Sequence, residues 1–246
     1  LTSAERKTMA EAYVAAAKGR MTTIVQVGTN SLVDSRDLAA HAAAIGADAV
    51  SATPPTYFKP AGADALAACV AEIAGGAPGL PFYYYHIPTI TGVEVNMPAF
   101  LKSAASRVPS LAGIKFCSAA MHELRECITV DGGRYDILSA WDEMLLAGLA
   151  MGARGAVGST YNFAAPLYLR LVGAFDRGDL ATARLCQDRA LQMINAILSA
   201  CGRAGLKGMM SLVGIDCGPH RMPLASATPE QFAKLRAAME QLGFAA

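Results

Sequence analysis

Hydrophobic and polar positions along the chain alternate between a helical period and short strand-like runs. Thr2 and Glu5 stand three residues apart, which is the spacing of a capping box, and they predict a helix that ends before Gly19. Residues 23–28 form an apolar run typical of a buried strand, and a helical pattern follows over 35–45. The chain therefore opens with a helix, a strand and a second helix.

The same strand and helix unit recurs along the first two thirds of the chain. Strands are predicted at residues 23–28, 48–53, 81–87, 112–117, 136–140 and 156–160. Only helical patterns follow, at residues 166–175, 179–200, 207–212 and 229–242. Strands that alternate with helices imply a parallel sheet, which is either doubly wound or closed as a barrel.

The choice between these two folds depends on the glycine pattern. No G-x-G-x-x-G or Walker A run is present, and such a run would favour a nucleotide-binding doubly wound sheet. We therefore expect an α/β fold of the TIM-type (β/α) barrel with extra C-terminal helices. Residues 1–165 would supply six βα units of the barrel, and residues 166–246 would form a helical extension of the same domain.

The composition is that of a globular protein and excludes several classes of partner. The chain is 53% hydrophobic and 17% charged, which is too apolar for a disordered protein. Its 21 Lys and Arg residues nearly balance 20 Asp and Glu residues, so no basic field attracts nucleic acid or an anionic membrane. Every apolar stretch ends well short of the roughly 20 residues that span a bilayer. We expect neither nucleic acid nor a membrane as a partner.

Cysteine usage points to a reducing compartment. The six cysteines contain no CxxC pair and no Cys/His spacing, which argues against structural zinc and against a dense disulfide framework. A cytoplasmic protein without a metal fits this pattern. The first residue is Leu1 rather than Met, and no apolar signal-peptide core follows it. We expect that the sequence lacks its native beginning.

Lys115 is the most informative position in the sequence. In the fourth predicted strand Ile114 and Phe116 share one face, and Lys115 shares the other with Gly113 and Cys117. If the apolar pair packs on helices, the lysine points into the barrel. It is then paired with a carboxylate, extended to the strand end, or held with a lowered pKa. The last case makes a nucleophile, because imine formation needs the neutral amine.

Two tyrosines and a histidine lie near the ends of predicted strands. Tyr85 is near the C-terminal end of the third strand, the catalytic edge of a barrel, where its phenol would carry a proton or simply pack. His86 has the opposite parity, so we expect it to face the helices as a structural residue. Tyr57 follows another strand and is a candidate for packing, for the pocket or for a subunit contact.

Polar residues follow the last two predicted strands. Asp142 and Glu143 begin a helix, and the positive end of its dipole alone would explain them. On the same rim as Lys115, they would also accept hydrogen bonds from a polyhydroxylated ligand. Gly158 and Ser159 form either a polar turn or a set of donors to a polar substrate.

Together these segments resemble the pyruvate-dependent class I aldolases, the family that includes N-acetylneuraminate lyase and dihydrodipicolinate synthase. The specific marks are Tyr-x-x-Pro at 85–88, the Gly-x-Lys strand ending in Lys115, Asp142-Glu143, and Gly-Ser-Thr-Tyr-Asn from Gly158. The resemblance extends from Leu1 to about Leu224. The runs 83–88 and 218–224 resemble the sialic-acid lyase branch, and Ile90 stands where dihydrodipicolinate synthases usually have an arginine.

The resemblance implies a (β/α)8 barrel, usually a tetramer, that needs no metal or organic cofactor. Lys115 would form a Schiff base with C2 of a 2-oxo acid. Tyr85 would carry the proton of the substrate hydroxyl as the C3–C4 bond breaks, which releases pyruvate and N-acetylmannosamine from sialic acid. The expected substrate-binding residues are Tyr57, Cys117, Ala140, Asp142, Glu143, Gly158 and Ser159. Cys117 stands where the family commonly has threonine or serine.

The resemblance also implies two further βα units before the first helix, the second of which carries the carboxylate-binding loop. Six units cannot close the usual barrel, because the strands at 23–28 and 156–160 would leave open apolar edges. We expect that a piece is missing from the sequence or that another copy covers the edges by domain swapping. Two alternatives stay open: an aldolase for another 2-oxo-3-deoxy sugar acid, and a truncated non-catalytic isoform that acts by oligomerisation.

Overall fold

A computed structural model describes residues 1–244 of the chain. They divide into two compact units. The first contains residues 1–140 and 151–156, and the second contains residues 141–150 and the chain from Val157 onward. Within the described residues, no helix is both long and apolar enough to cross a membrane.

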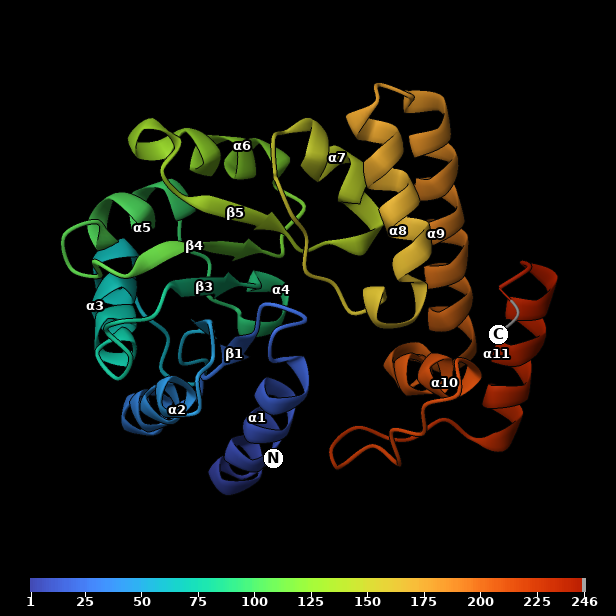
Figure 1. Cartoon of the computed structure of the whole chain (residues 1–246), viewed down its shortest axis with the longest axis horizontal. Helices are drawn as coiled ribbons and strands as arrows, with labels where there is room; N and C mark the ends of the chain where they lie inside the picture. Colours follow the sequence, from blue (N-terminus) through green and yellow to red (C-terminus); the bar gives the residue numbers. More distant parts are fainter. Residues whose placement is uncertain (245–246) are drawn as a thin grey trace. The chain divides into compact units, whose positions relative to one another are not determined.

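The first unit is built on a parallel sheet of five strands that are ordered in the sheet as they are in the chain (Figure 1). The strands are β1 (Ile24–Gln26), β2 (Ala49–Ala52), β3 (Phe82–His86), β4 (Leu111–Phe116) and β5 (Asp136–Ser139). The helices of this unit are α1 (Ser3–Ala17), α2 (Leu32–Ala44), α3 (Ala63–Ala74), α4 (Pro88–Thr91), α5 (Met97–Ala104) and α6 (Met121–Thr129), and α6 leads into a 3₁₀ turn, η1 (Val130–Gly133). Helical crossovers let consecutive strands run in the same direction.

One face of this sheet carries the apolar core of the first unit. Phe82 and Tyr84 on β3, and Ile114 and Phe116 on β4, are almost fully buried in it. These residues alternate along their strands, as the period of two requires. The intervening residues, Lys115 among them, lie on the opposite face and are partly buried. The parity predicted for the lysine strand is therefore confirmed.

Five of the six predicted strands are present in the sheet, and the prediction of a strand at 156–160 is wrong. There only Ala156 forms a single bridge, to Ser139 at the end of β5. The chain then turns, and Gly158 lies so close to the carboxyl group of Asp142 that a Cβ would collide with it. A turn built around a buried carboxylate therefore replaces the predicted strand.

The second unit is helical. It contains the 3₁₀ turn η2 (Asp142–Met144), α7 (Leu145–Ala150), α8 (Tyr161–Asp176), α9 (Leu180–Cys201), the 3₁₀ turn η3 (Gly202–Ala204), α10 (Gly205–Leu212) and α11 (Pro229–Gln241) (Figure 1). The long helix α9 packs against α8 and α11. Met193 and Ile197 on α9 and Leu235 on α11 are buried and form part of this interior.

Helix α8 begins at Tyr161, earlier than the predicted start at Pro166. A proline inside a helix lacks an N–H and crowds the preceding turn. The backbone responds at Ala164, where φ is −125° and ψ is 22°, outside the helical range. The helix therefore continues through the proline with a local distortion, which sequence pattern alone reads as a helix start.

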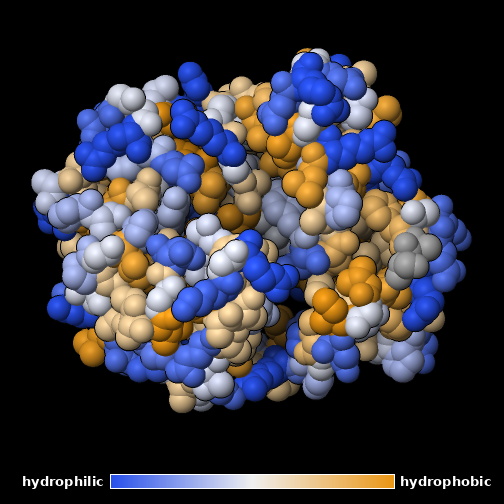
Figure 2. Space-filling model, viewed as in Figure 1, coloured by the Kyte–Doolittle hydropathy of each residue, from blue (hydrophilic) through white to orange (hydrophobic). Residues whose placement is uncertain are grey.

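One face of the molecule shows how polar and apolar side chains are distributed on its surface. On the face shown in Figure 2, hydrophilic and hydrophobic side chains are interspersed. This agrees with the near balance of 21 basic and 20 acidic residues in the sequence.

Candidate active site

Lys115 and Tyr85 lie side by side on the face of the sheet opposite the apolar core. They are paired residues of the neighbouring strands β4 and β3. The ammonium Nζ of Lys115 is 3.9 Å from the centroid of the Tyr85 ring, which is a cation–π contact. Two residues that are thirty positions apart in sequence are thus held together by strand register, and an amino group and a phenol share one location.

The strand ends next to this pair are held by backbone hydrogen bonds. The N–H of Cys117 donates to the carbonyl oxygen of His86 at 2.8 Å, and the N–H of Ala140 donates to that of Phe116 at 3.0 Å. The ladders of β3, β4 and β5 therefore continue one residue beyond the regular strands. They place Cys117 and Ala140 at the same C-terminal edge as Tyr85 and Lys115.

In the second unit, Asp142 is the centre of a buried hydrogen-bond cluster. Its side-chain Oδ2 accepts from the backbone N–H of Thr160 at 2.9 Å and from the Thr160 hydroxyl at 2.5 Å. An ionised carboxylate only accepts, so the Thr160 hydroxyl donates here and accepts from the Tyr168 hydroxyl, 2.6 Å away. Asp142 is only 7% exposed, and these side-chain hydrogen bonds join it to a residue 18 positions later in the chain.

A glutamine of α9 completes the turn that carries Asp142. The side-chain amide of Gln187 donates to the backbone carbonyl of Asp142 at 3.1 Å, and its oxygen accepts from the N–H of Leu146 at 3.0 Å. Gln187 is itself buried, so both halves of its amide are satisfied in the interior. Helix α9, through Gln187, therefore holds the turn that carries Asp142 and Glu143.

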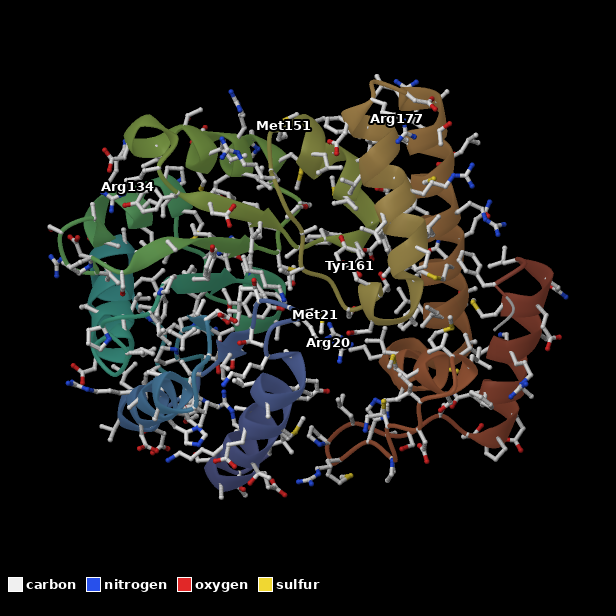
Figure 3. All side chains as sticks on the ribbon, in the orientation of Figure 1. Arg20, Met21, Arg134, Met151, Tyr161 and Arg177 are labelled. Atoms are coloured by element: carbon white, nitrogen blue, oxygen red, sulfur yellow. The ribbon has the colours of Figure 1, made fainter. Side chains whose placement is uncertain are left out.

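The phenols beside this cluster are held in the protonated form. Tyr161 begins α8 (Figure 3), and its ring contacts that of Tyr168 edge to face at 4.3 Å. Burial raises the pKa of both phenols well above the usual value, and the nearby Asp142 carboxylate adds to the effect. Tyr168 therefore acts as a neutral donor to Thr160.

Comparison with known proteins identifies the family. The model of the dihydrodipicolinate synthetase family matches residues 1–242. The chain belongs to this family. Among its curated relatives, N-acetylneuraminate lyase A of Xenopus laevis is 42% identical over 91% of this chain and 74% of the relative. The N-acetylneuraminate lyase of Rattus norvegicus is 39% identical over 99% of this chain and 78% of the relative.

Solved structures of the dihydrodipicolinate synthetase family have the same fold. The N-acetylneuraminate lyase of Proteus mirabilis superposes with a TM-score of 0.94 at 41% identity. The superposition covers 99% of this chain and 82% of the lyase chain. A dihydrodipicolinate synthase from Bacteroides thetaiotaomicron superposes with a TM-score of 0.89 at 27% identity, over 98% of this chain and 82% of its own. Of these two structures, the lyase is the more similar to this chain in sequence and in fold.

The other predicted site residues, Glu143, Ser159 and Tyr57, differ in how exposed their side chains are. Glu143 is half-buried on η2, and Ser159 is exposed, with its backbone carbonyl accepting from the side chain of Asn162 at 2.9 Å. Tyr57 is 80% exposed, and its ring contacts Phe58 edge to face. The structure therefore does not place Tyr57 in the cluster around Lys115.

The sequence analysis did not identify a polar pair that lies two residues before Tyr85 and Lys115 along the strands. The hydroxyl of Tyr83 donates to Oδ2 of Asp136 at 3.0 Å. Burial and the adjacent carboxylate raise the pKa of Tyr83 to about 12. Parity along β3 places Tyr83 on the same face as Tyr85, but a partner 53 residues away leaves no local signal.

The described residues contain no group of three or more His, Cys, Asp or Glu side chains that could hold a metal ion. An amine beside a phenol suits covalent catalysis on a carbonyl group, with proton transfer by the phenol.

Proposed function

We propose that the protein is an N-acetylneuraminate lyase that cleaves N-acetylneuraminate to pyruvate and N-acetylmannosamine through a Schiff base. The observation that carries the proposal is the contact of 3.9 Å between Lys115 Nζ and the ring of Tyr85. Its support is a family whose curated members of this name are 37–44% identical to the chain.

In the proposed mechanism, Lys115 is the nucleophile. Its neutral amine attacks the C2 carbonyl of the 2-oxo acid, and loss of water gives a protonated imine. When the C3–C4 bond breaks, its electron pair enters the imine and forms an enamine, while the C4 hydroxyl loses its proton and becomes the aldehyde of the released sugar. Protonation at C3 and hydrolysis of the imine then release pyruvate and regenerate the amine.

In the proposed mechanism, Tyr85 is the proton carrier. The phenolate accepts the proton of the C4 hydroxyl during cleavage, and the phenol gives a proton back in the reverse condensation. The register of β3 and β4 holds the phenol next to the amine, so one substrate can present its C2 to Lys115 and its C4 hydroxyl to Tyr85.

We propose substrate contacts for the remaining predicted residues. Cys117 follows β4, which carries Lys115, and Ala140 follows the neighbouring strand β5, which supports a contact from each with the bound substrate. Glu143 and Ser159 carry groups that accept from or donate to sugar hydroxyls. Their neighbours Asp142 and Gly158 would shape the loop rather than contact the sugar directly, and Tyr57 would contact substrate or a second subunit.

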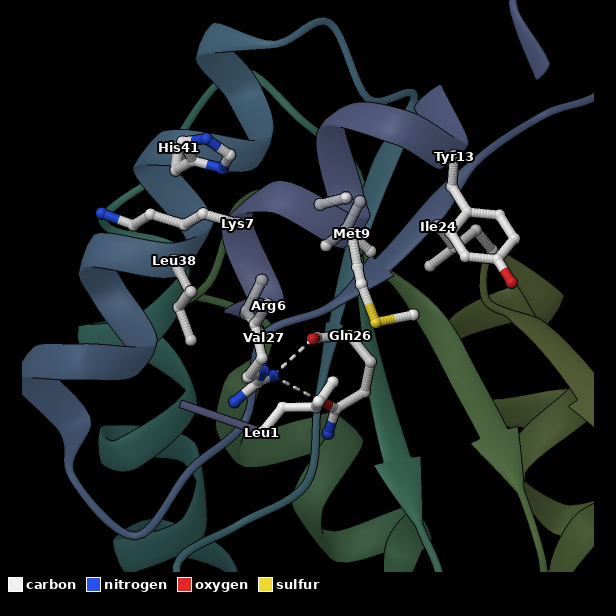
Figure 4. Close-up of a pocket in the computed structure, with 12 residues that line it drawn as sticks. Leu1, Arg6, Lys7, Met9, Tyr13, Ile24, Gln26, Val27, Leu38 and His41 are labelled. Carbon is white, nitrogen blue, oxygen red and sulfur yellow. Dashed lines mark hydrogen bonds between the residues drawn. The ribbon is translucent and has the colours of Figure 1, made fainter. Parts of the chain in front are cut away.

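We propose that the complete fold is a closed barrel, in which further strands pair with the outer edge of β1. β1 is the last strand of the sheet on its side. Beside it, α1 and β1 enclose a pocket of about 240 Å³, lined by Met9, Tyr13, Ile24 and Gln26 among others (Figure 4). The relatives extend beyond the matched region, which supports additional βα units.

We also propose a cytoplasmic homo-oligomer, supported by the cysteine pattern and by the family. An apolar edge such as that of β1 favours association or further pairing. Neither assignment is needed for the chemistry at Lys115.

The test of the proposed function is imine trapping combined with a cleavage assay. Incubation with pyruvate and borohydride should add one reduced pyruvyl group, and peptide mapping should place it on Lys115. Lys115→Ala should lose both the adduct and cleavage, whereas Tyr85→Phe should keep the adduct and lose cleavage by orders of magnitude. A Lys115→Ala variant that still cleaves N-acetylneuraminate would show that the mechanism is wrong.

A substrate comparison separates the alternatives. Faster turnover of 2-oxo-3-deoxygluconate than of N-acetylneuraminate would assign the chain to a different sugar acid. A parent protein with neither adduct nor cleavage would instead be a non-catalytic form.

A further inference from the structure

The register between β3 and β4 shifts by one residue just before the reactive pair. Phe82 pairs with Leu111, but the next residue, Tyr83, pairs with Gly113, so Ala112 is an extra residue in β4. This is a β-bulge, which is rare between parallel strands and recurs next to active sites. Leu111 is buried in the core although it is an odd number of positions from Ile114, which the extra residue explains.

The bulge decides which residue of β4 faces Tyr85. Without the extra residue, the pairing that starts at Phe82 and Leu111 would place Ile114 beside Tyr85, and Lys115 would pair with His86 instead. A slip of one residue also exchanges the two faces of a strand. The contact between Lys115 and Tyr85 therefore depends on this bulge.

A hydrogen bond crosses the sheet at the level of the bulge. Tyr83, Gly113 and Asp136 are consecutive partners on β3, β4 and β5. The Tyr83 hydroxyl reaches past β4 and donates to Oδ2 of Asp136 at 3.0 Å. Gly113 lies between them, and a Cβ there would collide with the backbone carbonyl of Asp136, so only glycine fits.

The next row on the same face contains the reactive pair. Tyr85, Lys115 and Leu138 are consecutive partners on the three strands. Two residues along a strand correspond to roughly 7 Å, so the row of Tyr83 and Asp136 lies directly below. An extra residue leaves the ladder locally unpaired, and the bond between Tyr83 and Asp136 ties the flanking strands across that gap.

We infer that Tyr83 and Asp136 are positioning residues for the lyase reaction, because their hydrogen bond fixes the bulge that holds Lys115 against Tyr85. This inference rests on the proposed function. The raised pKa of Tyr83, about 12, keeps its phenol protonated at neutral pH, so it stays a donor to Asp136 and does not compete with Tyr85 for the substrate proton. A displacement of about 1 Å in a reacting group costs up to roughly a hundredfold in rate.

The test measures how kcat and KM divide in variants of this pair. Tyr83→Phe keeps the ring and removes the donor, and Asp136→Ala removes the acceptor. Each should lower kcat about tenfold, with KM changed less than about twofold, because the reacting groups are misplaced while substrate contacts remain. Asp136→Asn keeps an oxygen that accepts from Tyr83 and should restore most of kcat. Thr129→Val, which removes the hydroxyl of an exposed residue at the end of α6, is the control and should behave as the parent.

A second measurement separates positioning from a purely structural role. The rate at which borohydride traps pyruvate on Lys115 should fall in Tyr83→Phe by a factor similar to that in kcat. If Tyr83→Phe lowers only the thermal midpoint and leaves kcat and trapping at the parent's values, the inference is overturned while the proposed function stands. If the parent itself forms no pyruvyl adduct, the proposed function fails and this inference fails with it.

Discussion

At the scale of single residues, His86 shows how burial sets a protonation state. It is 3% exposed on the core face of β3, and its ring lies 5.1 Å from that of Phe116 and 6.3 Å from that of Tyr84. Its Nδ1 makes no hydrogen bond to the described residues. Burial lowers the pKa of His86 to about 4, so the imidazole is neutral in the folded protein at neutral pH.

We expect this histidine to make folding stability dependent on pH. The unfolded chain binds a proton at His86 near pH 6.5, whereas the folded protein does so only near pH 4. Stability should therefore fall as the pH drops from about 6.5 towards 4, by up to about 3 kcal/mol from this group. Urea unfolding at pH 7.5 and pH 4.5 measures the loss.

The matched variants for this prediction are His86→Phe and His122→Gln. His86→Phe keeps a ring in the core and should lose less stability between the two pH values than the parent does. His122 is exposed on α6, and His122→Gln should follow the parent. If His86→Phe loses as much stability as the parent, the buried histidine is not the source of the pH dependence.

The hydroxyl of Thr160 makes a second prediction at this scale. It donates to Asp142 and receives the hydrogen bond of Tyr168. Thr160→Val has nearly the same shape but removes one of the two hydrogen bonds from Thr160 to Asp142 and the acceptor of the Tyr168 hydroxyl, which should lower the free energy of unfolding by about 1–3 kcal/mol. Thr160→Ser keeps the hydroxyl and should retain most of the stability in the same denaturant titration. Equal losses in the two variants would show that the methyl group, and not the hydroxyl, matters at this position.

At the scale of elements, local patterns predicted most helices and strands because their signals lie within a few residues. The capping box of Thr2 and Glu5 is present at the start of α1, and the apolar alternation around Lys115 correctly predicted β4. The prediction of a strand at 156–160 was wrong because Gly158 packs against the carboxylate of Asp142, sixteen positions earlier in the chain. The hydrophobic pattern of the sequence carries no signal of contacts between residues so far apart.

The candidate site was predictable only in part, for the same reason. Strand parity placed Lys115 on the face opposite Ile114 and Phe116, and the sequence also placed Tyr85 near the end of a strand. Their contact also needs the extra residue at Ala112, and one residue of register leaves no mark in the hydrophobic pattern. The bond from Tyr83 to Asp136 joins strands that are not consecutive, so it emerges only when the sheet is assembled.

The close approach of two strand ends gives a prediction about Gly28. It follows β1, and a Cβ there would lie 2.6 Å from the backbone N and 2.7 Å from the backbone O of Thr53, which follows β2. Gly28→Ala should force these segments apart and lower the free energy of unfolding by about 1–3 kcal/mol. Gly79→Ala is the matched control, because a Cβ there meets no atom within 4 Å. A thermal midpoint of Gly28→Ala equal to that of Gly79→Ala would contradict the prediction.

At the scale of the whole molecule, apolar side chains gather along the outer edge of β1. Ile24 on this strand is 39% exposed, and Met9 and Tyr13 of α1, which line the same pocket, are also exposed (Figure 4). The guanidinium group of Arg6 covers part of the edge, since it donates to the backbone carbonyls of Gln26 at 2.6 Å and Gly28 at 3.1 Å. An edge strand with exposed apolar side chains is a template for pairing with another chain.

We expect a protein of this sequence to self-associate through that edge. Its weight-average sedimentation coefficient should rise with concentration, and Ile24→Lys should reduce the rise, because a charge on an edge strand opposes pairing. Val33→Lys is the control: Val33 is 74% exposed on α2 and does not line the pocket, so this variant should sediment like the parent. If Ile24→Lys associates as strongly as Val33→Lys, the edge of β1 is not the contact. If neither variant nor the parent associates, the prediction is wrong, and the polar groups over the edge of β1, Arg6 among them, are enough to prevent pairing with another copy.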